Sequence, residues 1–214
     1  RLRCAAGAGG PAAVTGAEGR PARDGARRWR TPLVAWAASR ALVLGLGVAA
    51  SLALGEPTRG VDPAVPGPLA QLGGWDTTWY LDVARNGYEH DLGQVGEVFT
   101  NLAFFPLLPA IMAGFVALGL NPFLGALVLS NLAFLGALAA LHALTRRLRG
   151  AIAADRATWT LALFPPAAYC SLAYTEGLAL LLAVGAALLV VARRPAAAGL
   201  AGAAAALARP PGIA

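Results

Sequence analysis

Apolar residues in this chain come in long runs, and polar residues gather in the connections between those runs. The runs are about 17 to 25 residues long, the length that an α-helix needs to cross the hydrocarbon of a bilayer. Residues 178–192 lack the polar face that a soluble amphipathic helix shows at a period of 3.6 residues. The pattern predicts an all-α fold, a polytopic bundle of transmembrane helices, and disfavours a soluble Ala-rich bundle.

The breaks between the runs define the expected elements. A first transmembrane helix is expected over residues 32–54, with Arg40 close enough to its start to snorkel to the cytoplasmic headgroups. A short helix is expected over 77–86, and Asn86-Gly87 is a good C-terminal stop. Further apolar segments are expected at 103–120, 122–144, 157–172, 177–192 and 196–208.

Composition and charge support a membrane location. The chain is 57% hydrophobic, and its net charge of +6 comes from 17 arginines, because it has no lysine. Seven of these arginines fall in residues 1–30, which are expected to form a disordered, basic cytoplasmic tail ahead of a membrane domain over 31–214. The segment 55–102 is rich in acids and is expected to be external. This distribution fits cytoplasmic flanks and predicts no nucleic-acid partner.

The charge pattern also constrains the later segments. Arginines at 146–156 and 193–194 should both be cytoplasmic, which places 174–176 on the same outer side as Asp76. Segment 103–120 would then be re-entrant or lie along the outer surface, an interpretation that its two early prolines favour. If the segment crosses instead, the positive-inside rule fails at 146–156.

The stretch 73–87 combines aromatic rings with carboxylates in a chain dominated by Ala, Leu and Gly. Asp76 has two open interpretations: an N-cap of the short helix, or a general base at the membrane–water boundary. Trp75, Trp79 and Tyr80 are interpreted either as interface anchors or as a sugar-binding surface beside that carboxylate.

A second group of candidates lies around the Tyr174-Thr175-Glu176 segment. Glu176 is expected either to stabilise a helix N-terminus or to act in a site at membrane level. Arg209 would be an outer arginine, for which a lipid phosphate would supply a reason, and Arg85 is an alternative phosphate ligand. Cys4, Cys170, His90 and His142 show no metal-ligand or disulfide spacing, so no metal site is predicted.

Six motifs then occur in order and resemble one family: Trp75-Asp76-x-x-Trp79-Tyr80, Asn86-Gly87-Tyr88, Ala103-Phe104-Phe105-Pro106-Leu107-Leu108-Pro109, Ser130-Asn131-Leu132-Ala133-Phe134, Leu163-Phe164-Pro165 leading to Tyr174-Thr175-Glu176, and Ala208-Arg209-Pro210-Pro211-Gly212. The chain resembles the PIG-V mannosyltransferases, in particular their actinobacterial members, which are polytopic GT-C glycosyltransferases. The resemblance implies a transferase that uses polyprenyl-phosphate mannose as donor, with Asp76 as the general base.

We therefore expect an inverting mannosyltransferase of the cell membrane that acts on a glycolipid or glycan acceptor at the outer face. Asp76 is the expected catalytic residue; the expected substrate-binding residues are Trp75, Trp79, Tyr80, Arg85, Tyr174, Glu176 and Arg209. No cofactor is certain, and a divalent cation is possible at the leaving phosphate. The chain starts with Arg1 and stops at Ala214, so a piece truncated at its C-terminus is expected, and the expectation of activity applies to the longer protein.

Two other classes stay open at the sequence level. A transporter or flippase for a lipid-linked solute would share the broken helices but should carry ionisable groups at mid-membrane in repeated halves. A non-catalytic scaffold subunit of envelope assembly would use Asp76 as a cap alone.

Overall fold

The computed structural model describes residues 21–54, 62–89 and 100–209, with side chains from Trp29 onward. Over these ranges the chain is helical and has no strand, which confirms the all-α prediction. Its α-helices are α1 (Pro21–Leu54), α2 (Asp76–Asn86), α3 (Leu107–Ala117), α4 (Pro122–Arg149), α5 (Ala151–Leu163), α6 (Glu176–Val191) and α7 (Pro195–Ala208), joined by the 3₁₀ helices η1 (Gly67–Leu72), η2 (Asn101–Ala103) and η3 (Pro165–Ser171).

Within the described ranges two helices are long and apolar enough to cross a bilayer: α1 from Trp29 to Leu54, and α4. They have 26 and 28 residues and so extend about 40 Å each, more than the hydrocarbon thickness of about 30 Å. The bent pair of η3 and α6 makes a third candidate if the two form one span. The predicted first span is confirmed, but α1 already begins at Pro21. The predicted disorder is therefore wrong for residues 21–30, which are helical, while 1–20 lie outside the described residues. The cytoplasmic location of the tail stays a prediction.

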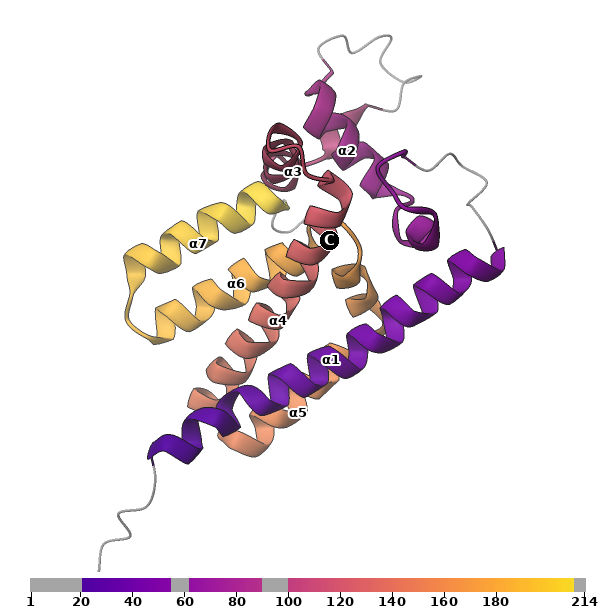
Figure 1. The fold of residues 1–214 in the computed structure, drawn as a ribbon. Helices are drawn as coiled ribbons and strands as arrows, with labels where there is room; N and C mark the ends of the chain where they lie inside the picture. The colour runs from indigo at the N-terminus through magenta and orange to yellow at the C-terminus, as the bar shows by residue number, and fades with distance from the viewer. Residues whose placement is uncertain (1–20, 55–61, 90–99, 210–214) are drawn as a thin grey trace, which may run out of the picture.

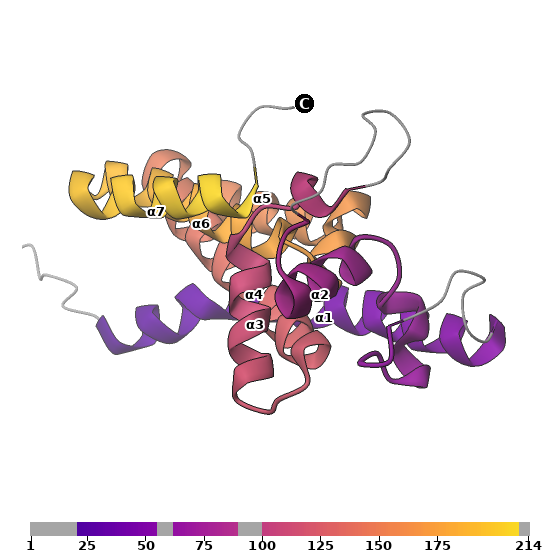
Figure 2. The same cartoon turned by 90° about the horizontal axis from the view of Figure 1, so that it is seen from above.

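Helix α4 is the centre of the bundle. It packs against α1, α5 and α6, and α6 and α7 form a hairpin on one side of it (Figures 1 and 2). Phe134 and Leu138 of α4 are fully buried in one apolar cluster, and Phe123 of the same helix is buried in a second cluster with Met112. The side of α4 that faces away from the bundle is also apolar, with Val128 and Leu132 more than half exposed, as expected for a helix in contact with lipid.

Helix α3 is much shorter than a span. Its 11 residues extend about 16 Å, which is half of the hydrocarbon thickness. The turn after it stays beside the segment that follows α1, because the Asn121 Nδ2 donates to the Ala64 carbonyl at 2.7 Å. The length agrees with the prediction that 103–120 does not cross.

The predicted connection 146–156 is helical at both ends. Helix α4 continues to Arg149 and α5 starts at Ala151, with Gly150 alone between them at φ 87°, a conformation that favours glycine. The break expected at Pro165-Pro166 is present, because α5 ends at Leu163 and the 3₁₀ helix η3 begins at Pro165. A second bend of 106° separates η3 from α6.

Arg40 corrects a second expectation. Its side chain does not snorkel to headgroups: the residue is 2% exposed, and its guanidinium faces η3. Its hydrogen-bond partners there are the Ala167 carbonyl and the buried Ser171 hydroxyl.

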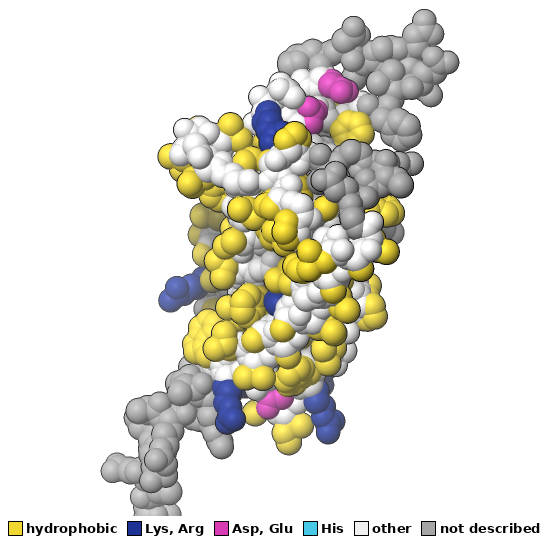
Figure 3. All heavy atoms as spheres, turned by 45° about the vertical axis from the view of Figure 1, so that its right-hand side comes forward, with side chains coloured by type: hydrophobic (Ala, Val, Ile, Leu, Met, Phe, Trp, Pro, Cys, Tyr) yellow, Lys and Arg dark blue, Asp and Glu magenta, His cyan; other side chains and the backbone are white. Residues whose placement is uncertain are grey.

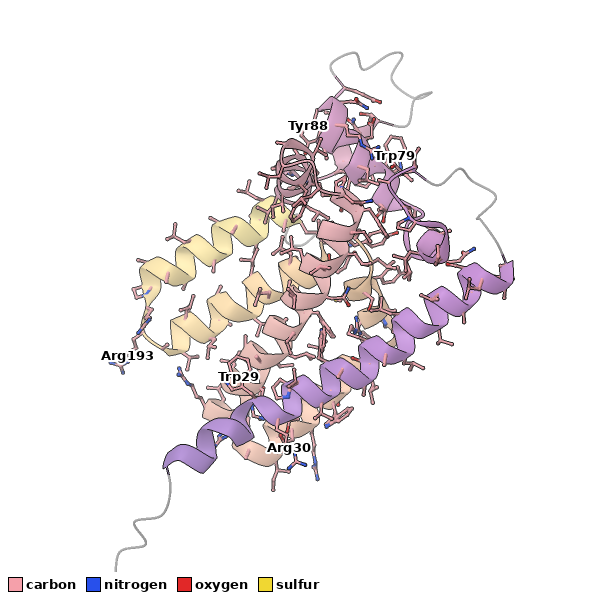
Figure 4. The ribbon with its side chains drawn as sticks, in the orientation of Figure 1. Trp29, Arg30, Trp79, Tyr88 and Arg193 are labelled. Atoms are coloured by element: carbon pink, nitrogen blue, oxygen red, sulfur yellow. The ribbon has the colours of Figure 1, made fainter. Side chains whose placement is uncertain are left out.

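Charged groups concentrate towards the two ends of the bundle. Hydrophobic side chains cover most of the area between the charged ends on the face seen in Figure 3. Trp79 and Tyr88 lie at one end, whereas Trp29 and Arg30 lie at the other (Figure 4). This distribution is typical of a helical membrane protein.

Candidate functional site

The candidate site forms where the start of α2 meets the junction of η3 with α6. Asp76 is the first residue of α2, and Trp75 occupies the N-cap position with φ 61° and ψ −127°. No side chain caps this helix, so the interpretation of Asp76 as an N-cap is wrong. Instead, the backbone N–H of Asp76 donates to the Tyr174 hydroxyl at 3.3 Å, and its carboxylate stays exposed.

Tyr174 links three parts of the chain. Its hydroxyl donates to the Gly74 carbonyl at 3.4 Å, and its own carbonyl accepts a hydrogen bond of 2.8 Å from Ser130 Oγ of α4. Gly177 lets α6 approach α4 at this level, because a Cβ there would lie 2.5 Å from the Ser130 carbonyl oxygen. The motif that contains Ser130 and the motif that contains Tyr174 are thus held beside Asp76.

An ion pair closes the other side of the site. Arg209, at the end of α7, donates to Glu176 Oε1 at 2.6 Å, with 58% of the arginine side chain exposed. The second oxygen of Glu176, Oε2, is buried and has no partner among the described residues. Glu176 therefore binds Arg209 through one carboxylate oxygen, while its other oxygen is buried without a bonded partner among the described residues.

The electrostatics of Asp76 follow from its surroundings. Partial loss of water raises the pKa of the Asp76 carboxyl above its ordinary value, while the charge of Arg209 acts in the opposite direction. A raised pKa makes the carboxylate a stronger base than a free aspartate, which suits proton abstraction.

Aromatic rings form a row beside these charges. Neighbouring centroids lie 5.1 to 6.5 Å apart along the series Tyr169, Tyr174, Tyr80, Phe104 and Trp79. Tyr80 is buried, its hydroxyl lies 3.4 Å from Thr175 Oγ1, and burial raises the pKa of Tyr80 to about 12. Its hydroxyl therefore stays protonated at neutral pH.

The structure separates two predicted binding residues from this centre. Arg85 lies nine residues along α2 from Asp76, about 13 Å by helix geometry, and pairs with both oxygens of Asp62 at 2.5 and 3.0 Å. Trp79 stacks on Phe104 at 5.7 Å, at the end of the aromatic row. By contrast, Trp75 is 87% exposed next to Asp76.

A cavity of about 430 Å³ opens next to the ion pair. Glu176 and Arg209 are the charged residues of its lining, and the remaining walls come from α5, η3, α6 and α7 and are apolar: Leu161, Phe164, Pro166, Ala167, Cys170, Ala179, Leu180, Ala183, Gly202, Ala205 and Ala206. An apolar cavity with one charged edge suits a ligand that has an apolar chain and a charged head.

Comparison with known proteins now identifies the family. A family model described as Mannosyltransferase (PIG-V) matches residues 44–213, which include every candidate site residue. The chain belongs to the PIG-V mannosyltransferases. No significant match was found among curated proteins or among solved structures.

Membership of the PIG-V family makes the chain a glycosyltransferase-type membrane protein with mannosyl transfer as the general activity. The possible divalent cation stays a prediction, since no group of three or more His, Cys, Asp or Glu gathers in the described part of the chain. His90 lies outside that part, and His142 pairs with Asp155 at 3.1 Å at the far end of the bundle.

Several residues of this PIG-V chain have positions that the sequence reasoning did not anticipate. Ser130 and Asn131 were noted as part of a motif, but their contacts are to the backbone around Tyr174 and Ser171. Two polar residues within the apolar run of α4 were the available signal. Tyr169 stacks on Tyr174 at 6.1 Å, and a lone tyrosine in an apolar segment gave no indication of it.

Proposed function

We propose that this protein transfers mannose from polyprenyl-phosphate mannose to a hydroxyl of a glycolipid or glycan acceptor at the outer face of the cell membrane. Asp76 acts as the general base. The observation that supports this most is the position of Asp76, which is exposed at the start of a helix without a side-chain cap and interacts electrostatically with Arg209. Arg209 in turn borders the apolar cavity.

The proposed step is a single displacement. The acceptor oxygen attacks the anomeric carbon while its proton passes to Asp76, and the bond between that carbon and the phosphate oxygen breaks. The lipid phosphate leaves with the electron pair, so the configuration at the anomeric carbon inverts. A positioned base of this kind contributes about 10²–10⁴ in rate.

Arg209 is the proposed phosphate ligand. Its guanidinium is exposed and held by one carboxylate oxygen, so it can donate further bonds to a phosphate that carries the developing charge. Arg85 is less suitable because Asp62 already occupies two of its donors. The start of the polyprenyl chain would lie in the apolar cavity that Arg209 borders.

Trp75 is the proposed contact for a sugar. Its ring is exposed beside Asp76, and its left-handed φ is costly for a tryptophan, which points to a functional constraint on the turn. An aromatic face next to a carboxylate offers a sugar both an apolar contact and a hydrogen-bond acceptor.

Transfer from a labelled donor tests the proposal. Membranes that contain the complete protein are incubated with radiolabelled polyprenyl-phosphate mannose, and the label is followed into glycolipid and protein, with nucleotide-linked mannose as the matched donor control. Label is expected in glycolipid or protein when the lipid-linked donor is supplied, and not when nucleotide-linked mannose is supplied. Movement of intact donor between leaflets without any product would favour the transporter, and no donor-dependent change would favour the scaffold.

The proposed orientation has its own test. Asn86→Cys on α2 should react in intact cells with a thiol reagent that does not cross membranes. Arg149→Cys at the end of α4 should react with that reagent only after the cells are permeabilised. Both positions are exposed, so accessibility does not depend on unfolding. The reverse pattern would place Asp76 on the cytoplasmic side and contradict the outer-face reaction.

A further inference from the structure

Arg40 is a buried arginine within the first membrane helix. It is 2% exposed, and its Nη1 donates to the Ala167 carbonyl at 3.1 Å and to Ser171 Oγ at 2.5 Å. Its Cζ lies 4.4 Å from the centre of the Phe134 ring. The guanidinium thus joins α1 to the first turn and the last residue of η3, with an aromatic face of α4 against it.

Burying this group is costly. The Nε and Nη2 atoms are buried and have no hydrogen-bond partner among the described residues. An apolar side chain of similar volume would fill the same space without that cost. An ionisable residue inside a membrane helix is therefore a candidate for a functional role, and its bonded partners indicate which one.

Those partners belong to the segment that builds the candidate site. Ala167 lines the apolar cavity, and Ser171 is three residues before Tyr174. The same turn is held from α4, because Asn131 Nδ2 donates to the Ser171 carbonyl at 3.3 Å. The 106° bend between η3 and α6 leaves few backbone bonds across the turn, so side chains must fix it.

We propose that Arg40 is a positioning residue: it fixes the η3 turn, and through that turn the Tyr174–Glu176 end of the site and one wall of the cavity. It touches no reacting group itself. The residue precedes the matched residues 44–213, so the family match does not bear on it. The catalytic consequence of this role rests on the proposed mannosyl transfer, whereas the anchoring of η3 does not.

Cys170 is a native probe of the anchoring, because it is a buried residue of η3 next to Ser171. With Cys4 replaced by serine throughout, the rate at which N-ethylmaleimide modifies Cys170 is measured in the folded complete protein. Arg40→Met should raise this rate about tenfold or more, since local opening exposes the thiol, and Arg40→Lys should fall between the two.

Two variants serve as controls. Ser39→Ala changes the neighbouring buried residue, whose hydroxyl donates to the backbone of its own helix, and Met112→Ala weakens the other apolar cluster. Neither should raise Cys170 modification, even where Met112→Ala lowers the melting temperature as much as Arg40→Met does. An Arg40→Met rate equal to the parent's, or matched by Met112→Ala, would overturn the proposal.

The catalytic arm uses the transfer assay. Arg40→Met should lower kcat by about 10- to 100-fold per folded molecule, the range expected when catalytic groups are misplaced by about 1 Å. It should also shift the acidic limb of the pH profile, which lost folding alone cannot do, and Arg40→Lys should recover part of both. The role would be refuted if total activity fell only in proportion to the amount of folded protein and the acidic limb of the pH profile stayed in place. Absence of transfer in the parent would refute the proposed function, while the thiol measurement would still decide the anchoring.

Discussion

Two aspartates near the starts of helices, at opposite ends of the bundle, have opposite surroundings. Asp155, near the start of α5, accepts bonds from Thr31 and His142, and these lower the pKa of its carboxyl. Asp76, at the start of α2, receives no cap bond to its side chain, and partial loss of water raises the pKa of its carboxyl. Asp155 is thus used to join helices, and Asp76 is left available.

The surroundings of an aspartate, rather than its residue type, thus distinguish a structural carboxylate from one that can take part in a reaction. A carboxylate whose charge is already stabilised by its neighbours is a weak base, whereas one with few bonds can accept a proton or a substrate hydroxyl. The apolar cavity and Arg209 occur at the Asp76 end. We infer that chemistry belongs to this end and that the other end holds the helices together.

The largest effect is expected from exchanging each carboxylate for its amide. Asp76→Asn should lower the turnover of mannosyl transfer by about 10²–10⁴, because it removes the base and keeps the shape. Asp155→Asn should leave turnover per folded molecule near that of the parent. Both variants are assayed in membranes with amounts normalised to folded protein. Equal losses in the two variants would abolish the distinction.

A smaller effect is expected from the two arginines at the Asp76 end of the bundle. Arg209→Gln should lower kcat/KM by about 10²-fold, since it removes a donor aimed at the developing charge. Arg85→Gln is the matched control, because that arginine is already bonded to Asp62, and its kcat/KM should change little. Initial rates over a range of donor concentrations measure both. A larger loss of kcat/KM in Arg85→Gln than in Arg209→Gln would indicate that the phosphate binds at the other end of α2, at Arg85.

The smallest effect concerns stability, and the contributions of Asp76 and Asp155 to it should change with pH in opposite directions. The raised pKa of Asp76 means that the folded protein holds this proton more tightly than the unfolded chain, so its contribution to stability falls as the pH rises through the raised pKa. The lowered pKa of Asp155 means a contribution that is present at neutral pH and lost as the pH falls through the folded pKa.

Thermal unfolding in detergent at neutral pH should therefore rank the variants. Asp76→Asn should melt at or slightly above the parent, and Asp155→Asn below it, with differences of about a few degrees. The order should disappear at a pH where both carboxyls are protonated. Destabilisation by Asp76→Asn at neutral pH would show that this carboxylate is structural after all.

The apolar runs were sufficient to predict the membrane helices, because length and hydropathy are properties of each segment alone. The first span, the stop at Gly87 and the break after α5 all follow from such local signals. The start of α5 was missed because four arginines around Gly150 indicated a cytoplasmic connection, although arginine is a good helix former.

Contacts between distant segments could be predicted less well. The distribution of arginines placed Asp76, Tyr174, Glu176 and Arg209 on one side, and the structure brings them together. The sequence did not show that Trp75 would take the cap position, since aspartate is the commoner cap. The burial of Arg40 depends on where η3 lies, which no property of α1 reveals.

The pH dependence of kcat/KM for mannosyl transfer tests the central claim most directly. If Asp76 is the base, the rate should fall as the pH decreases through a midpoint above the ordinary aspartate value of about 3.9, because partial loss of water raises the pKa of this carboxyl. The limb should be absent from the residual activity of Asp76→Asn and present in Asp155→Asn. A rate that stays flat down to about pH 4, or an acidic limb that persists in Asp76→Asn, would contradict the account.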